Sequence, residues 1–147
     1  MSQRPADLLF EKGLKTLKEG NVPSALSFFE KSVSLDENPI NSSYLAYCIA
    51  RERGQFKKAI SMCNEAIKKE PENSVIYLNL ARVYLLSDKR ADAIEALRKG
   101  MSCEKNQEIL NELNSLGIRK PPIFRFLNRA NPVNKYLGVV LKRLGLR

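Results

Sequence analysis

The 147-residue sequence contains no histidine and no tryptophan, and only three cysteines: Cys48, Cys63 and Cys103. Without histidine, a Cys/His zinc site or a histidine-based catalytic triad cannot be built. The cysteines are widely spaced, odd in number and free of any CxxC motif, so we expect reduced thiols that pack as small apolar side chains. We therefore expect no metal and no cofactor.

Long apolar runs are absent as well. No segment approaches the roughly 20 apolar residues that a helix needs to cross a bilayer. The first residues, MSQRPADLLFEKG, reach charge before the apolar core of a signal peptide could form. These two absences predict a cytoplasmic protein.

Acidic residues are missing from the C-terminal part of the chain. Residues 113–147 contain no Asp or Glu, whereas residues 1–112 are nearly neutral, so the formal charge of +9 comes almost entirely from the end of the chain. The cations of this basic extension are Arg119, Lys120, Arg125, Arg129, Lys135, Lys142, Arg143 and Arg147.

What the sequence does contain is a repeat with a period of 34 residues, over 6–39, 40–73 and 74–107. Apolar residues recur within each segment at helical spacing. Each segment therefore predicts two helices of about 13 residues joined by a tight turn. Gly20 and Gly54 suit such a turn because glycine accepts a positive φ after a helix end, and Asp88 occupies the same position in the third segment.

The three segments resemble the tetratricopeptide repeat. The matching residues are Tyr77, Leu80, Ala81, Tyr84, Ala93 and Leu97 in the third segment, Ala59, Ala66 and Pro71 in the second, and Gly13, Ala25 and Phe29 in the first. The second segment departs from the pattern at Ser43 and Tyr47, and Glu37 and Lys105 stand where proline is expected. The resemblance implies an all-α fold, a right-handed superhelical stack of three antiparallel helix pairs.

The resemblance also implies a function, that of a non-catalytic adaptor or scaffold. In this family the first helix of each pair lines a concave groove that binds a peptide or a helix of another protein. The corresponding residues are Phe10, Leu14, Leu17, Tyr44, Cys48, Arg51, Leu78, Arg82 and Leu85. We expect apolar contacts to supply most of the binding energy, and Arg51 and Arg82 to orient the ligand.

One subclass of the family binds the C-terminal carboxylate of chaperone tails through Lys, Asn and Arg side chains. Here the matching positions hold Phe10, Leu14, Leu45, Val75 and Asn79. The charged donors that a carboxylate requires are missing. We therefore do not expect a chaperone tail as the partner.

Residues after the repeats predict two further helices. Residues 107–117, QEILNELNSLG, read as a helix that caps the stack, and Gly117 ends it. Two consecutive prolines at 121 and 122 then predict an extended crossover within 118–131. Asn131 and Pro132 begin a last helix over about 132–144.

The role of the extension, 118–147, is left open. Its apolar residues are expected to fold back on the stack, where they could cover part of the groove, or onto a partner. Its cations form a solvated face, or bind an acidic protein, nucleic acid or an anionic membrane surface. A third alternative is a homodimer formed through the apolar stripe of the last helix.

Overall fold

The computed structural model describes residues 2–117, 142–143 and 145. The chain divides into two compact units, Met1–Leu113 and Asn114–Arg147. The expected crossover and most of the helix expected at 132–144 lie outside the described residues. Lys142 and Arg143 have helical backbone and exposed side chains.

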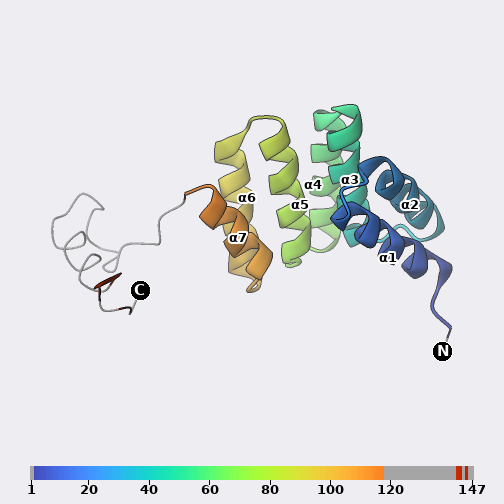
Figure 1. The fold of residues 1–147 in the computed structure, drawn as a ribbon, viewed down its shortest axis with the longest axis horizontal. Coiled ribbons are helices and arrows are strands. Elements are labelled where there is room, and N and C mark those ends of the chain that lie inside the picture. The colour runs from blue at the N-terminus through green and yellow to red at the C-terminus, as the bar shows by residue number, and fades with distance from the viewer. Residues whose placement is uncertain (1, 118–141, 144, 146–147) are drawn as a thin grey trace. The chain divides into compact units, whose positions relative to one another are not determined.

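The first unit is built from helices, and no strand occurs in the described part of the chain. In order they are α1 (Pro5–Lys18), α2 (Val22–Leu35), α3 (Pro39–Arg53), α4 (Phe56–Lys69), α5 (Ser74–Leu86), α6 (Arg90–Cys103) and α7 (Gln107–Ser115). The first six form three antiparallel pairs, α1/α2, α3/α4 and α5/α6, stacked side by side (Figure 1). The expectation of an all-α stack of helix pairs is confirmed.

Local sequence signals set the ends of these helices. Asn21, Asn38 and Asn73 each accept a hydrogen bond from a backbone N–H of the helix that follows, which satisfies a donor that the first turn leaves unpaired. The turns within the three pairs use the left-handed backbone region, at Gly20 (φ 83°), Gly54 (φ 64°) and Asp88 (φ 61°). Aspartate tolerates this region better than most residues.

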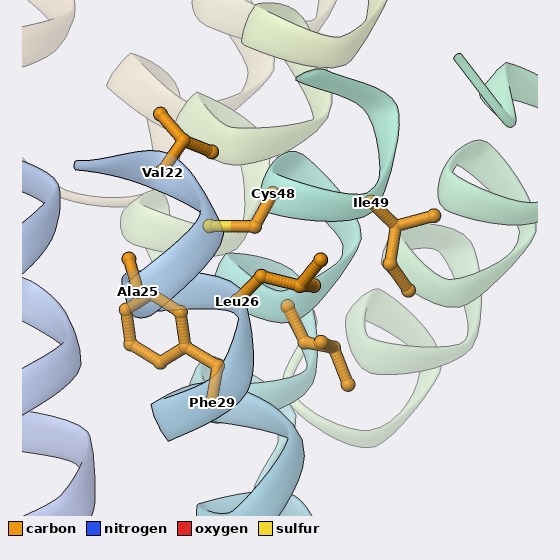
Figure 2. Close-up of a cluster of buried hydrophobic side chains, with 7 residues drawn as sticks. Val22, Ala25, Leu26, Phe29, Cys48 and Ile49 are labelled. Atoms are coloured by element: carbon orange, nitrogen blue, oxygen red, sulfur yellow. The ribbon is translucent and has the colours of Figure 1, made fainter. Parts of the chain in front are cut away.

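Small residues allow the helices to approach closely. Ala25, Ala59 and Ala93, one from each repeat, are all 0% exposed. Figure 2 shows how α2 and α3 share a core, in which α2 contributes an apolar stripe that includes the fully buried Phe29. The residues of this cluster are Val22, Ala25, Leu26 and Phe29 from α2 with Leu45, Cys48 and Ile49 from α3.

Buried polar side chains connect successive pairs. The Ser32 hydroxyl donates to the backbone oxygen of Ala6 (2.8 Å) and accepts from the Asn41 amide (2.9 Å). The Asn79 amide donates to the Ser43 hydroxyl (2.9 Å), so α5 is connected to α3. A buried polar group left without a partner is costly, and these bonds therefore help to fix the register between pairs.

The last described helix, α7, covers the end of the third pair. Asn106 accepts from the backbone N–H groups of Glu108 and Ile109, and its amide donates to the Ser74 hydroxyl. The Ile109 side chain is 0% exposed and lies against Gly100, where any Cβ would come within 2.8 Å of it. Helix α7 thus occupies the position of the expected cap.

No helix in the described residues is both long and apolar enough to span a bilayer.

Candidate binding face

The first helices of the three pairs present a common surface. One stripe of α3 begins at Ile40. Tyr44, Tyr47 and Arg51 follow Ile40 by four, seven and eleven residues, a spacing that places all four on the same side of the helix. None of the four is buried, whereas Ala46 on the opposite side is 0% exposed. We call this surface of the first helices the A-helix face. It consists of Phe10 and Leu14 of α1, this stripe of α3, and Val75, Arg82 and Leu86 of α5.

Two aromatic rings, packed on a third that is buried, form the apolar end of this face. The Tyr44 ring lies 5.5 Å from the Phe10 ring in an edge-to-face arrangement, and 5.6 Å from the Phe29 ring, between ring centroids. Phe29 is fully buried beneath them, whereas Phe10 and Tyr44 are half-buried. Aromatic rings held this way offer rigid apolar area at the surface, which is what binding hot spots use.

Two arginines contact one tyrosine further along the face. The guanidinium carbons of Arg51 and Arg82 lie over the Tyr47 ring, 5.8 Å and 5.7 Å from its centroid. Arg51 Nη1 also donates to the Tyr47 hydroxyl at 3.2 Å. The Tyr47 ring therefore joins a cation of its own helix to a cation of α5.

The charge of Arg82 is matched by α7. Its guanidinium lies 3.1 Å from the Glu108 carboxylate and 3.6 Å from that of Glu112, and its side chain is 22% exposed. Burial raises the pKa of the nearby Tyr44 hydroxyl, Glu108 raises it further, and Arg82 opposes them. Arg82, which the sequence predicted to orient a ligand, is already engaged by two carboxylates of its own chain.

The structure separates the nine predicted groove residues into two groups. Phe10, Leu14, Leu17, Tyr44, Arg51, Arg82 and Leu85 are half-buried or exposed. Cys48 and Leu78 are 0% and 1% exposed, and their assignment to the groove lining was wrong. Cys48 is four residues from Tyr44 and therefore lies beside the same stripe, but it packs in the α2–α3 cluster because α2 covers that side of α3.

Sequence reasoning missed Tyr47. The repeat pattern expects a small residue at this position, so the tyrosine was counted only as a departure. The signal was present, because Tyr47 and Arg51 are four residues apart and share a helix face. The pairing of Tyr47 with Arg82 of another helix had no such signal.

The positions that hold a carboxylate in the chaperone-binding subclass offer no charged donor here. Leu45 is 7% exposed and belongs to the core. Asn79 is 0% exposed, and its amide donates to Ser43. Phe10, Leu14 and Val75 are apolar and half-buried.

Of the predicted basic residues, Lys142 and Arg143 are described and exposed. Arg119, Lys120, Arg125, Arg129 and Lys135 lie outside the described residues.

Two of the three cysteines, Cys48 and Cys63, are buried in the part of the chain that the structure describes. No cluster of Cys, Asp or Glu there could hold a metal ion. Burial raises the pKa of the Cys48 and Cys63 thiols to about 12 each, so both stay protonated near neutral pH. A protonated thiol is a poor nucleophile.

Comparison with known proteins agrees with this architecture. Residues 50–113 match the family model for the tetratricopeptide repeat. The chain is 28% identical over 102 residues to mouse DnaJ homolog subfamily C member 7, which covers 67% of this chain and 21% of that protein. It is 27% identical over 116 residues to the Hsp70-Hsp90 organising protein of Plasmodium falciparum, covering 74% and 21%. The chain thus spans about a fifth of the length of these relatives.

Solved structures with the same fold include two tetratricopeptide domains. The first such domain of the human RPAP3 protein is 26% identical, with a TM-score of 0.62 over 76% of this chain and 89% of that one. The first such domain of Spaghetti (RPAP3), bound to the HSP90 peptide SRMEEVD, is 25% identical, with a TM-score of 0.61 over 80% and 94%.

Proposed function

Because the chain belongs to the tetratricopeptide-repeat family, we propose that it is a non-catalytic adaptor that binds a segment of another protein on its A-helix face. The observation that carries this proposal is the composition of that face, where half-buried aromatic rings and arginines from three helices lie on one surface. A cytoplasmic location is part of the same proposal.

The physical basis of binding would be apolar burial on a rigid surface. Covering apolar area contributes roughly 25 cal/mol per Å², and aromatic anchors contribute most in known interfaces. Tyr44 and Tyr47 are fixed by ring and guanidinium contacts before a ligand arrives. A preorganised face loses less side-chain entropy on binding than a flexible one.

We propose that the partner presents an internal segment rather than its C-terminal carboxylate. The solved relative that holds an HSP90 peptide suggests a chaperone tail as an alternative. Against it, the buried Leu45 and the hydrogen-bonded Asn79 leave no charged donor at those positions of this chain. Peptide SRMEEVD and the same peptide with an amidated C-terminus should therefore both bind more weakly than about 100 µM, a weak affinity on the usual scale.

A matched pair of leucines tests the A-helix face. Leu86 is 41% exposed and ends α5 on this face, whereas Leu35 is 61% exposed and ends α2, the second helix of its pair, which contributes no residue to the face. Both Leu→Asp changes place the same charge at a helix C-terminus, so their effects on stability should be alike. Circular dichroism should show equal helix content for the two variants.

The readout is the set of proteins that purified full-length chain captures from its native cell extract, at about 100 mM and about 500 mM salt. Surface charge interactions are largely screened at the higher salt. Leu86→Asp should lose partners that survive high salt, and Leu35→Asp should keep them. Equal capture by both variants would show that the partner binds elsewhere.

The acid-free sequence of 113–147 favours a second candidate function, the binding of an anionic surface. On duplex DNA, about four phosphate contacts would give a log–log salt slope of roughly −3 to −4. A flat salt dependence, or capture that persists after nuclease treatment, would exclude DNA as this ligand. Light scattering over a range of concentrations separately tests the homodimer.

A further inference from the structure

Arg51 differs from Arg82 in its charge environment. Arg82 is paired with two carboxylates of α7, as described above. Among the described residues Arg51 has no ion pair, and its guanidinium donates a hydrogen bond to the Tyr47 hydroxyl. Arg51 is also exposed, and this hydrogen bond uses one of the five N–H donors of its guanidinium.

The Tyr47 contact orients Arg51 without neutralising it. The hydrogen bond and the ring contact restrict the guanidinium, yet a phenol carries no charge at neutral pH. When a ligand covers this part of the face, water is displaced and an unpaired guanidinium becomes costly to bury. The ligand that fits therefore brings its own anion.

The spacing on α3 sets where that anion stands. Tyr44 and Arg51 are seven residues apart, which at the helical rise corresponds to about 10 Å along the face. This distance matches about three residues of an extended segment or about seven of a helical one. A ligand that contacts both the aromatic end and Arg51 must place an apolar side chain and a carboxylate at such a separation.

We propose that Arg51 determines partner specificity by pairing with an Asp or Glu side chain of the bound segment, about 10 Å from the apolar side chain that contacts Phe10 and Tyr44. The inference rests on the proposed function and narrows it to an apolar segment that carries an acidic side chain. Arg82 has a structural role, because α7 already supplies its carboxylates.

The test uses a random 16-residue peptide library displayed on phage, selected on the full-length wild-type chain and on Arg51→Glu. Lys57→Glu serves as the control, because it makes the same change of charge at an exposed position of α4, the second helix of the pair. Urea unfolding of all three proteins verifies that they are folded. Enriched sequences are then synthesised as fluorescent peptides, each also with its acidic residue replaced by the amide.

Wild type and Lys57→Glu should enrich apolar peptides with an acidic residue at a fixed separation, and Arg51→Glu should enrich Lys or Arg at that place. Replacing the acid by its amide should weaken binding to wild type about tenfold, and binding to Arg51→Glu less than about twofold. Three results would overturn the role of Arg51 but leave the proposed function standing. The wild type could enrich apolar peptides that lack an acidic residue, or peptides whose acidic residue has no fixed separation from the apolar one. Alternatively, Arg51→Glu could enrich the same acidic peptides as the wild type. If none of the three proteins, wild type, Arg51→Glu or Lys57→Glu, enriches a peptide, the proposed function fails, and the role of Arg51 fails with it.

Discussion

Replacing Gly13 by alanine measures how closely α1 and α2 approach each other. A Cβ on Gly13 would lie 2.6, 2.8 and 2.9 Å from the Cε1, Cδ1 and Cζ atoms of the Phe29 ring. That ring is 0% exposed and contacts the rings of Phe10 and Tyr44, so it has little freedom to move. Real Cβ atoms essentially never come this close to another atom.

Two effects of opposite sign compete in this variant. Alanine is favoured over glycine inside a helix by roughly 0.5–1 kcal/mol. Inserting a methyl group into a packed core costs roughly 1–3 kcal/mol. Because three ring atoms are crowded at once, we expect crowding to dominate, with a net loss of about 1–2 kcal/mol in the free energy of unfolding.

Urea unfolding followed by circular dichroism gives the result directly. With a slope of about 2 kcal/mol per M, the midpoint should fall by roughly 0.5–1 M. In a Phe29→Leu background, Gly13→Ala should lower the midpoint less than it does in the wild type, since the smaller side chain removes the clash. A midpoint that rises in Gly13→Ala would refute the close packing of α1 on α2.

Gly54 supplies the control, because its constraint has a different origin. Nothing lies within 4 Å of a Cβ built there, but its φ of +64° disfavours most side chains. Asparagine tolerates this backbone region, as Asp88 does at the equivalent turn. Gly54→Asn should therefore cost less than Gly54→Ala, whereas Gly13→Asn should cost more than Gly13→Ala.

Three further predictions concern single groups. Arg82→Gln should lower hydrogen-exchange protection in α7 by about 0.5–1 kcal/mol, since the ion pairs with Glu108 and Glu112 are both lost, whereas the protection of α1 to α4 should not change. Hydrogen bonds from Ser74 lower the pKa of Glu104. The contribution of Glu104 to stability should therefore be complete above its ordinary pKa of 4.5 and be lost as the pH falls through its lowered pKa. In Glu104→Gln, the urea midpoint should change less with pH over this acid range. In the folded protein only the exposed Cys103 should react with a thiol reagent at pH 8, and all three cysteines should react in urea.

Each of these has a clear contrary result. A uniform loss of protection in Arg82→Gln would mean that the ion pairs support the whole stack. An unchanged acid profile in Glu104→Gln would mean that its bonds to Ser74 do not persist in solution. Rapid reaction of more than one thiol in native buffer would contradict the burial of the other two cysteines.

The sequence alone determined the helix pairs, their turns and the absence of charged donors for a ligand carboxylate. Such features are local, because helical periodicity, asparagine caps and turn residues depend on neighbours within about four positions. The glycines at 20 and 54 and the aspartate at 88 marked the turns correctly, since each has a positive φ. The stripe of Tyr44 and Arg51 could be placed on one helix face for the same reason.

Only the tertiary structure decided which of those side chains are available to a partner. Cys48 and Leu78 followed the family pattern for the groove, but the way each helix is rotated against its neighbours buried them. The contact of Tyr47 with Arg82 joins α3 to α5, and the pairing of Arg82 with Glu108 joins α5 to α7. Such contacts depend on distances and rotations between helices, which the spacing of residues within one helix does not fix.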